Sequence, residues 1–166
     1  MVIQLIHIDP EIRSILDTVH DPEVPVLTVM DMGIMRKVER DGKKVLLHIS
    51  PTYSGCPAMD TISDDLKSAF SAQGYEAEVK LVLSPAWTTD DMSEEGKRKL
   101  EEYGIAAPLS ESADKAALTG EPNQVPCPQC RSKNTKMVSA FGSTTCKALF
   151  QCNDCLEPFD YFKCLK

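Results

Sequence analysis

The C-terminal fold is decided by the stretch CPQCRSKNTKMVSAFGSTTCKALFQCNDC, residues 127–155. It begins and ends with a Cys-x-x-Cys pair, and 21 residues separate the two pairs. Each pair can sit on a tight turn at the end of a hairpin, so that four thiolates converge at about 2.3 Å on one tetrahedral metal ion. We therefore expect a metal site whose ligands are Cys127, Cys130, Cys152 and Cys155.

The first turn, CPQCRS at residues 127–132, resembles the knuckles of zinc ribbons. The resemblance covers about residues 124–166 and implies a small all-β module held together by its metal, because so short a segment contains too little core to fold alone. A rubredoxin-like iron site also takes four thiolates, but neither Cys130 nor Cys155 is followed by the glycine usual there, so we favour structural Zn²⁺ over iron. We expect the short strands at residues 136–140, 145–151 and 158–163.

Two further cysteines, Cys146 and Cys164, lie near the four expected ligands. We favour the interpretation that both are small buried side chains on ribbon strands, because free cysteine commonly packs as a hydrophobe. The alternative is that one of them replaces a named ligand, or that the two bind a second metal. In a reducing compartment such a cluster indicates a metal site rather than a disulfide framework.

The composition is that of a globular protein, with 42% hydrophobic and 26% charged residues among 166. No apolar run approaches the roughly 20 residues of a membrane helix, and residues 1–7 lack the features of a signal peptide, so we expect a cytoplasmic protein with no membrane partner. The net charge of −7 divides into −9 for residues 1–120 (12 basic, 21 acidic) and +2 for residues 121–166 (6 basic, 4 acidic). We expect no nucleic-acid partner, because the acidic part repels phosphate.

The sequence before the ribbon alternates helical and strand patterns, which predicts an α+β domain. Pro, Ser, Ala, Gly and Asn are frequent in residues 106–124, which we interpret as a linker between a first domain at residues 1–105 and the ribbon domain at residues 125–166. The expected helices run from Asp9 to near Asp21, from Pro57 to near Gly74 and from Ser93 onwards, and the expected strands occupy residues 33–39, 43–49 and 78–83.

Cys56 stands apart from the other six cysteines. It precedes Pro57 at the start of an expected helix, where unpaired backbone amides and the helix dipole favour an anion and lower the pKa of a thiol. No histidine is adjacent in sequence to act as a base, so metal or cluster ligation is favoured over covalent catalysis. The alternative is a buried and inert cysteine.

Four short motifs surround Cys56 in order: DPEVP at residues 21–25, DMGI at 31–34, GCP at 55–57 and PAWTTDDMSE at 85–94. In order and spacing they resemble the MIP18-like (DUF59) domain, over about residues 9–105. The resemblance implies a small mixed sheet packed by about three helices, and a role in the assembly or delivery of iron–sulfur clusters. One departure is SPTYS at residues 50–54, where cluster-assembly relatives often have a Thr-Thr-Pro-like run.

Asp21 and Glu23 flank a proline that stops the preceding helix, so their carboxylates lie on a turn that can approach the Cys56 loop. With Cys56 they are the candidates for handling iron or a cluster; the alternative is that they only end the helix and contact solvent. Trp87 follows Pro85 on an acidic loop and is the candidate for partner docking, with burial in the core as the alternative.

A MIP18-like domain followed by a zinc ribbon resembles the PaaD family, the D subunits associated with bacterial phenylacetyl-CoA epoxidase, over nearly the whole chain. This implies a non-catalytic accessory protein of phenylacetate degradation, which matures the iron–sulfur centre of the epoxidase reductase component. One thiolate cannot hold a cluster that takes four ligands, so we expect Cys56 to act transiently with a thiol of a partner subunit or of a second copy in a homodimer.

The alternative is a direct structural or catalytic subunit of the epoxidase. Against catalysis, the sequence shows no acid–base pair with recognisable spacing, no Gly-rich phosphate loop and no diiron ligand set.

Overall fold

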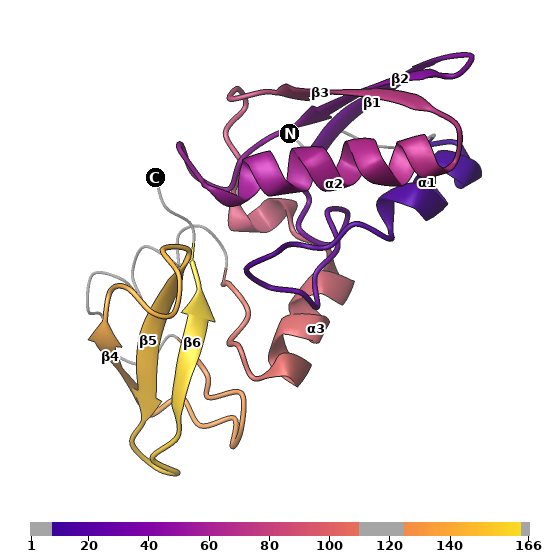
Figure 1. Ribbon diagram of the computed structural model, residues 1–166. Coiled ribbons are helices and arrows are strands. Elements are labelled where there is room, and N and C mark those ends of the chain that lie inside the picture. Colours follow the sequence, from indigo (N-terminus) through magenta and orange to yellow (C-terminus); the bar gives the residue numbers. More distant parts are fainter. Residues whose placement is uncertain (1–7, 110–124, 164–166) are drawn as a thin grey trace. The chain divides into compact units, whose positions relative to one another are not determined.

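The computed structural model describes residues 8–109 and 125–163, which hold three α-helices, a 3₁₀ helix (Thr89–Asp91) and two three-stranded sheets (Figure 1). These residues divide into two compact units. The first comprises residues 8–87 and 91–93, and the second comprises residues 88–90, 94–109 and 125–163. The predicted α+β domain and all-β ribbon are both confirmed.

The sheet of the first unit is mixed. β1 (Met35–Asp41) and β2 (Lys44–Ile49) are antiparallel, and β3 (Glu76–Leu81) pairs in parallel with the other side of β2. The parallel pair requires a crossover, which α2 (Ala58–Ala72) provides while covering one face of the sheet (Figure 1). Every second residue of β2 is buried, as expected for a sheet with one covered face.

α2 follows the sequence prediction closely. Its buried residues recur at helical spacing and form one stripe, as in an amphipathic helix that packs on a sheet. Phe70, at the end of the stripe, meets Tyr75 edge to face with ring centroids 6.1 Å apart. The stripe consists of Ala58, Met59, Ile62, Leu66 and Phe70.

α1 (Pro10–Leu16) begins as predicted and ends earlier than predicted. The Asp9 carboxylate accepts a hydrogen bond from the Glu11 N–H at 2.9 Å, which caps the first turn. After Leu16, the N–H groups of Thr18 and Val19 bond to carbonyls three residues back, and this tightening ends the helix. The expected continuation to near Asp21 is therefore wrong.

The second unit contains α3 (Glu94–Tyr103) and an antiparallel sheet in the order β4-β5-β6. Phe150 stacks on Phe159 with centroids 6.0 Å apart and meets Tyr161 edge to face at 5.5 Å, which forms the centre of a small core. The three strands are β4 (Thr135–Ser139), β5 (Lys147–Cys152) and β6 (Pro158–Phe162), each within two residues of the predicted positions.

Most of the expected linker, residues 110–124, lies outside the described residues. Its first residue, Ala106, pairs with β6: its N–H donates to the Asp160 carbonyl at 2.8 Å and its carbonyl accepts from the Phe162 N–H at 3.1 Å. The exact domain boundaries stay a prediction. Within residues 8–109 and 125–163, no helix combines the length and the apolar character that crossing a membrane requires.

Candidate metal centre and the Cys56 loop

Cys56 lies on the loop that joins β2 to α2. Because β2 and β3 are parallel, this loop follows the carboxyl end of a strand, which is where open sheets with parallel strands commonly bind ligands. Gly55 has a φ of 79°, a left-handed conformation that glycine adopts without strain, and the Cys56 N–H bonds to the Tyr53 carbonyl at 3.2 Å. The Cys56 sulfur lies within hydrogen-bonding reach of the Ala58 N–H at the start of α2.

The pKa of the Cys56 thiol is raised, so the predicted lowering is wrong. Burial is the largest cause, and the negative charges of Glu23 and Asp21 add to it. The Ala58 N–H and the Tyr53 side chain hydrogen-bond to the sulfur and oppose the shift without cancelling it. The helix start acts in the direction we expected, but half-burial and two carboxylates outweigh it. At neutral pH the thiol therefore stays protonated unless a cation displaces the proton.

Asp21 supports the turn after α1, as the structural alternative expected, but it does not lie in solvent. It is buried, and its Oδ1 accepts hydrogen bonds from the N–H groups of Glu23 at 2.7 Å and Val24 at 2.8 Å, which fixes the turn after α1. Its charge, with that of Glu23, also acts on the Cys56 sulfur. The structure thus brings the three candidate residues together.

Trp87 is 2% exposed, and its indole N–H donates to the Met32 carbonyl at 2.8 Å. A partner could not contact this ring without local opening of the fold, so its placement favours the core interpretation over the docking one. The neighbouring Gly33 has a φ of 66°, and a Cβ there would lie 1.8 Å from the Asp91 carbonyl oxygen. This position requires glycine both for its backbone angles and for the close approach.

Two residues near the Cys56 loop carry features that sequence reasoning missed. Tyr53, three residues before Cys56, places its side chain within hydrogen-bonding reach of the sulfur. The Ser50 hydroxyl is buried, with no hydrogen-bond partner among the described residues. Both belong to the SPTYS segment that departs from the expected motif, and this departure was the available signal.

The four predicted metal ligands meet in the second unit. The sulfur atoms of Cys127, Cys130, Cys152 and Cys155 all lie within 4.8 Å of one another. Cys127 Sγ is 3.7 Å from Cys155 Sγ, and Cys130 Sγ is 3.6 Å from Cys152 Sγ. A tetrahedron with metal–sulfur bonds of about 2.3 Å has edges of about 3.8 Å, whereas a disulfide bond measures about 2.05 Å. The geometry fits one tetrahedral metal ion.

Backbone hydrogen bonds shape both knuckles in the same way. The Cys127 N–H bonds to the Ser132 carbonyl and the Cys152 N–H to the Glu157 carbonyl, each at 2.9 Å. The residue after the second cysteine of each pair is left-handed, with φ of 64° at Arg131 and 66° at Leu156. At these two positions, where rubredoxin knuckles usually have glycine, Arg131 and Leu156 therefore adopt backbone angles that glycine favours.

Electrostatics explain why this site needs a cation. The Cys155 N–H, followed by the Asp154 N–H, lowers the pKa of Cys152 to about 7. For Cys155, a hydrogen bond from the Glu157 N–H is outweighed by burial and by the neighbouring sulfurs, which raise its pKa to about 12. One thiolate forms readily, and further ones require positive charge among them.

Hydrogen bonds between side chains also join the two Cys-x-x-Cys turns. The Asp154 carboxylate accepts hydrogen bonds from the Ser132 hydroxyl and, at 2.7 Å, from the Asn134 amide. Asn153 donates to the Asn134 side chain at 3.0 Å. These contacts hold the ligand-bearing turns together independently of the sulfurs, as supporting hydrogen bonds do around metal sites.

Cys146 is buried outside the four-sulfur cluster, with its sulfur 3.1 Å from the Thr144 hydroxyl. This agrees with a small packed side chain. Cys164 lies outside the described residues.

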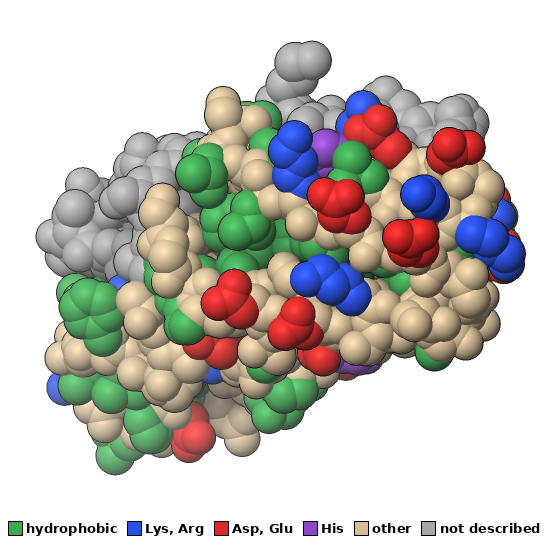
Figure 2. Space-filling model, turned by 45° about the horizontal axis from the view of Figure 1, so that its top comes forward, with side chains coloured by type: hydrophobic (Ala, Val, Ile, Leu, Met, Phe, Trp, Pro, Cys, Tyr) green, Lys and Arg blue, Asp and Glu red, His purple; other side chains and the backbone are tan. Residues whose placement is uncertain are grey.

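On the face of the molecule shown in Figure 2, acidic and basic side chains are interspersed, without the broad basic area that nucleic-acid binding uses.

Comparison with known proteins finds two family matches, one to the N-terminal part of the chain and one to the C-terminal part. Residues 9–81 match the family described as iron-sulfur cluster assembly protein, and residues 111–163 match the family described as PaaD zinc beta ribbon domain. A protein of Escherichia coli (strain K12), provisionally named as the D subunit of 1,2-phenylacetyl-CoA epoxidase, is 45% identical over 156 residues, which cover 93% of this chain and 92% of that protein.

Two further relatives match the first part. The Fe-S protein maturation auxiliary factor of Porphyromonas gingivalis (strain ATCC BAA-308 / W83) is 34% identical over 101 residues, covering 58% of this chain and 94% of that protein. The crystal structure of a domain of unknown function, DUF59, from Bacillus anthracis has a TM-score of 0.51 and 28% identity, covering 54% of this chain and 88% of that one.

Proposed function

The chain belongs to the PaaD family, in which an iron–sulfur cluster assembly domain precedes a zinc β-ribbon, and on that premise we propose that it is an accessory protein of phenylacetate degradation. In this role it assists the assembly of iron–sulfur clusters, or their delivery to the reductase component of the phenylacetyl-CoA epoxidase, and does not itself turn over substrate. The proposed location is the cytoplasm, where closely spaced thiols stay reduced.

The environment of Cys56 carries this proposal. The thiol is half-buried beside the charges of Glu23 and Asp21, and Tyr53 can hydrogen-bond to the sulfur. An arriving iron ion displaces the thiol proton, and the two carboxylates offset part of its positive charge. The site is therefore suited to a cationic cargo and stays neutral at the sulfur when empty.

The number of ligands indicates a transient cargo. Residues 1–126 contain one cysteine, Cys56, whereas an iron–sulfur cluster generally takes four protein ligands. Four of the other six cysteines are assigned to the metal site of the second unit, and we propose that the remaining cluster ligands come from another molecule. A protein that supplies only some of the ligands of a cluster can transfer that cluster to a recipient that supplies all of them.

For the four-cysteine site we propose Zn²⁺ in a structural role. Four sulfurs within 4.8 Å of one another fill a tetrahedral coordination sphere, so no position remains for water or substrate. Metal bound there stabilises the β4-β5-β6 sheet, whose core is small. Metal analysis of the purified chain tests this: one zinc per chain is expected, and stoichiometric iron in its place would contradict the assignment.

The test of the cluster role compares Cys56→Ser with Cys146→Ser, a matched change at the other described cysteine outside the four-sulfur cluster. Each variant is produced anaerobically with the reductase, whose iron and acid-labile sulfide are then measured. Cys56→Ser is expected to keep its zinc and lower the cluster content of the reductase, while Cys146→Ser leaves it unchanged. Full clusters with Cys56→Ser, or an equal loss with both variants, would refute the role of Cys56.

The second candidate is a direct subunit of the epoxidase, which the name of the Escherichia coli relative favours. Reconstituted turnover distinguishes the two. With a reductase already loaded with clusters, the accessory role predicts full turnover without this chain, whereas a direct subunit would be required throughout.

A further inference from the structure

β3 is an edge strand with an open side. The order of the first sheet is β1-β2-β3, so among the described residues no strand lies beyond β3. The N–H groups of Glu76 and Val82 bond to carbonyls of the β2 side, at 2.8 Å each. Successive residues of a strand point their backbone N–H and C=O groups to opposite sides. The N–H and C=O groups of Ala77, Val79 and Leu81 therefore point away from β2, toward the open side of the sheet. Three residues thus offer backbone hydrogen bonds to another strand.

This edge has no bulge, which is one of the devices that commonly protect edges. The opposite edge strand, β1, has a register shift between Met35 and Lys37, which interrupts regular pairing. The β2–β3 pairing is regular over all six residues. Apolar side chains follow at the end of β3, where Leu81 is 49% exposed and Leu83 is 66% exposed. The β3 edge therefore presents both backbone groups and apolar surface.

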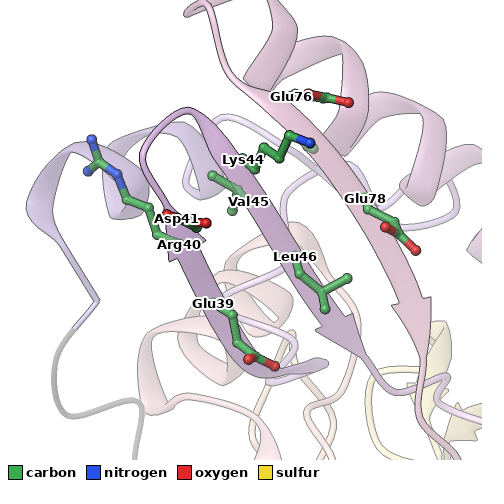
Figure 3. Close-up of a pocket in the computed structure, with 9 residues that line it drawn as sticks. Glu39, Arg40, Asp41, Lys44, Val45, Leu46, Glu76 and Glu78 are labelled. Carbon is green, nitrogen blue, oxygen red and sulfur yellow. The ribbon is translucent and has the colours of Figure 1, made fainter.

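The charged side chains of β3 determine which charges a partner strand must carry. Glu78 and Lys80 are exposed, and neither forms an ion pair with another residue of the described ranges. Figure 3 shows Glu78 on the open face of the sheet, beside a hollow of about 520 Å³ that also includes Leu46 and Glu39. A strand that pairs with β3 should place a basic residue opposite Glu78 and an acidic residue opposite Lys80.

A second copy of β3 meets this requirement in one register. In an antiparallel pair related by a two-fold axis at Val79, Glu78 faces Lys80 of the second copy, twice by symmetry, and Ala77 faces Leu81. Moving the axis by one residue places Glu78 opposite Glu78 or Lys80 opposite Lys80, and moving it to Ala77 places Glu76 opposite Glu78. Moving the axis to Glu78 also brings Glu76 opposite Lys80, but it sets the two Glu78 carboxylates against each other. Only the register centred on Val79 pairs opposite charges without opposing like charges, at the close non-hydrogen-bonded positions where side chains lie nearest.

We propose that this protein forms a two-fold dimer in which the β3 strands of two copies pair antiparallel about Val79, joining the two sheets into one of six strands. The hydrogen bonds run between Val79 and Val79 and between Ala77 and Leu81, and two Glu78–Lys80 ion pairs flank the axis. The occupant of this edge is a second copy of the chain, because its own charge sequence complements itself.

The arrangement also bears on the cluster site and, to that extent, rests on the proposed function. Antiparallel β3 strands place the carboxyl end of one beside the amino end of the other. Each Cys56 loop follows the carboxyl end of β2, which is parallel to β3, so the two loops lie at opposite ends of the joined sheet. The additional cluster ligands then come from the recipient rather than from the second copy.

The test measures self-association of the full-length, zinc-loaded chain by sedimentation equilibrium over a concentration series. Lys80→Glu converts both ion pairs into Glu–Glu contacts and is expected to weaken association at least about tenfold. The double change Glu78→Lys with Lys80→Glu restores opposite charges and is expected to restore association. Asp41→Lys, a charge reversal on the other edge strand, serves as the matched control and leaves association unchanged.

Val79→Pro gives a second, independent readout. The N–H that proline removes points away from the sheet, so the monomer retains its fold, checked by circular dichroism, while two dimer hydrogen bonds are lost. A wild-type chain that is monomeric at every concentration would overturn the proposal. So would a double variant that stays as weak as Lys80→Glu, or a folded Val79→Pro variant that dimerises like the wild type. None of these outcomes depends on cluster chemistry.

Discussion

Arg36 and Asp91 form a bidentate ion pair, with Nη1 3.2 Å from Oδ1 and Nη2 3.2 Å from Oδ2. The arginine side chain is 6% exposed and the aspartate side chain 17%. The pair joins β1 to a segment 55 residues later in the chain, within the motif that contains Trp87. It therefore holds the loop after β3 against the first strand of the sheet.

Asp91→Asn should destabilise the fold by about 3 kcal/mol, because it leaves the buried Arg36 charge without its counterion. Urea unfolding followed by tryptophan fluorescence measures this directly, since Trp87 is the single tryptophan and is buried in the first unit. Asp90→Asn, at an exposed neighbour, is the control and should change stability by less than about 0.5 kcal/mol. Equal stabilities of the two variants would contradict the importance of the pair.

Gly33→Ala should cost more than Gly42→Ala, although both glycines have similar left-handed backbone angles, with φ of 66° and 59°. A Cβ at residue 42 meets nothing within 4 Å, so only the left-handed strain of about 1 kcal/mol applies. At residue 33 the Cβ would overlap the Asp91 carbonyl, which adds about 1–3 kcal/mol. Urea midpoints that fall equally in both variants would show that the loop carrying Asp91 yields without cost.

Leu156→Gly should stabilise the metal-bound second unit by about 0.5–1 kcal/mol. Leu156 has a left-handed backbone, with a φ of 66°, and its side chain is 67% exposed, so glycine relieves backbone strain and removes little packing. The larger conformational entropy that glycine gives the unfolded chain offsets part of this gain. Competition with a zinc chelator measures the gain, because metal binding and folding of this unit are coupled. Val138→Gly, at an exposed residue of β4, should have the opposite sign. A loss in both variants would indicate that Leu156 contributes more through packing than through strain.

Glu23→Gln should lower the raised pKa of Cys56, because the Glu23 charge opposes ionisation of the thiol. The pH profile of alkylation at Cys56 itself, followed by peptide mass spectrometry with zinc protecting the four ligand thiols, should shift to lower pH, whereas Glu76→Gln leaves it in place. The raised pKa also means that the neutral thiol stabilises the fold below the unfolded pKa of about 9, and that this contribution is lost as pH rises through the folded pKa. An unshifted profile for Glu23→Gln would place its carboxylate too far from the sulfur to matter.

The features that the sequence predicted well depend on local spacing. Cys127 and Cys130 belong to one turn, as do Cys152 and Cys155, and ligand chemistry restricts how two such turns can combine. The stripe of α2 and the alternation of β2 likewise follow from the periodicity of their own residues. The approach of Asp21 and Glu23 to the Cys56 loop was expected from the proline that stops the preceding helix, and the structure agrees with it.

The features that the sequence missed depend on packing between distant segments. The helix start at Cys56 predicted a lowered pKa, but the amount of burial and the charges from the turn after α1 decide the direction. Trp87 looked available on a Pro-bounded loop, yet the loop folds so that its indole reaches the Met32 carbonyl. The Arg36–Asp91 pair links residues whose sequence neighbourhoods contain no sign of one another.

The parallel pairing of β2 and β3 determines when the Cys56 loop can exist. The turn that orders the β1–β2 hairpin is local, but Lys44 meets Glu76, so the parallel pair closes only after α2 and β3 have been synthesised. Such long-range contacts form late in folding, because the loop entropy must be overcome before the contact is gained. A chain still emerging from the ribosome therefore presents Cys56 without its supporting strand pair, and the half-buried environment of its thiol forms only after the first unit has folded.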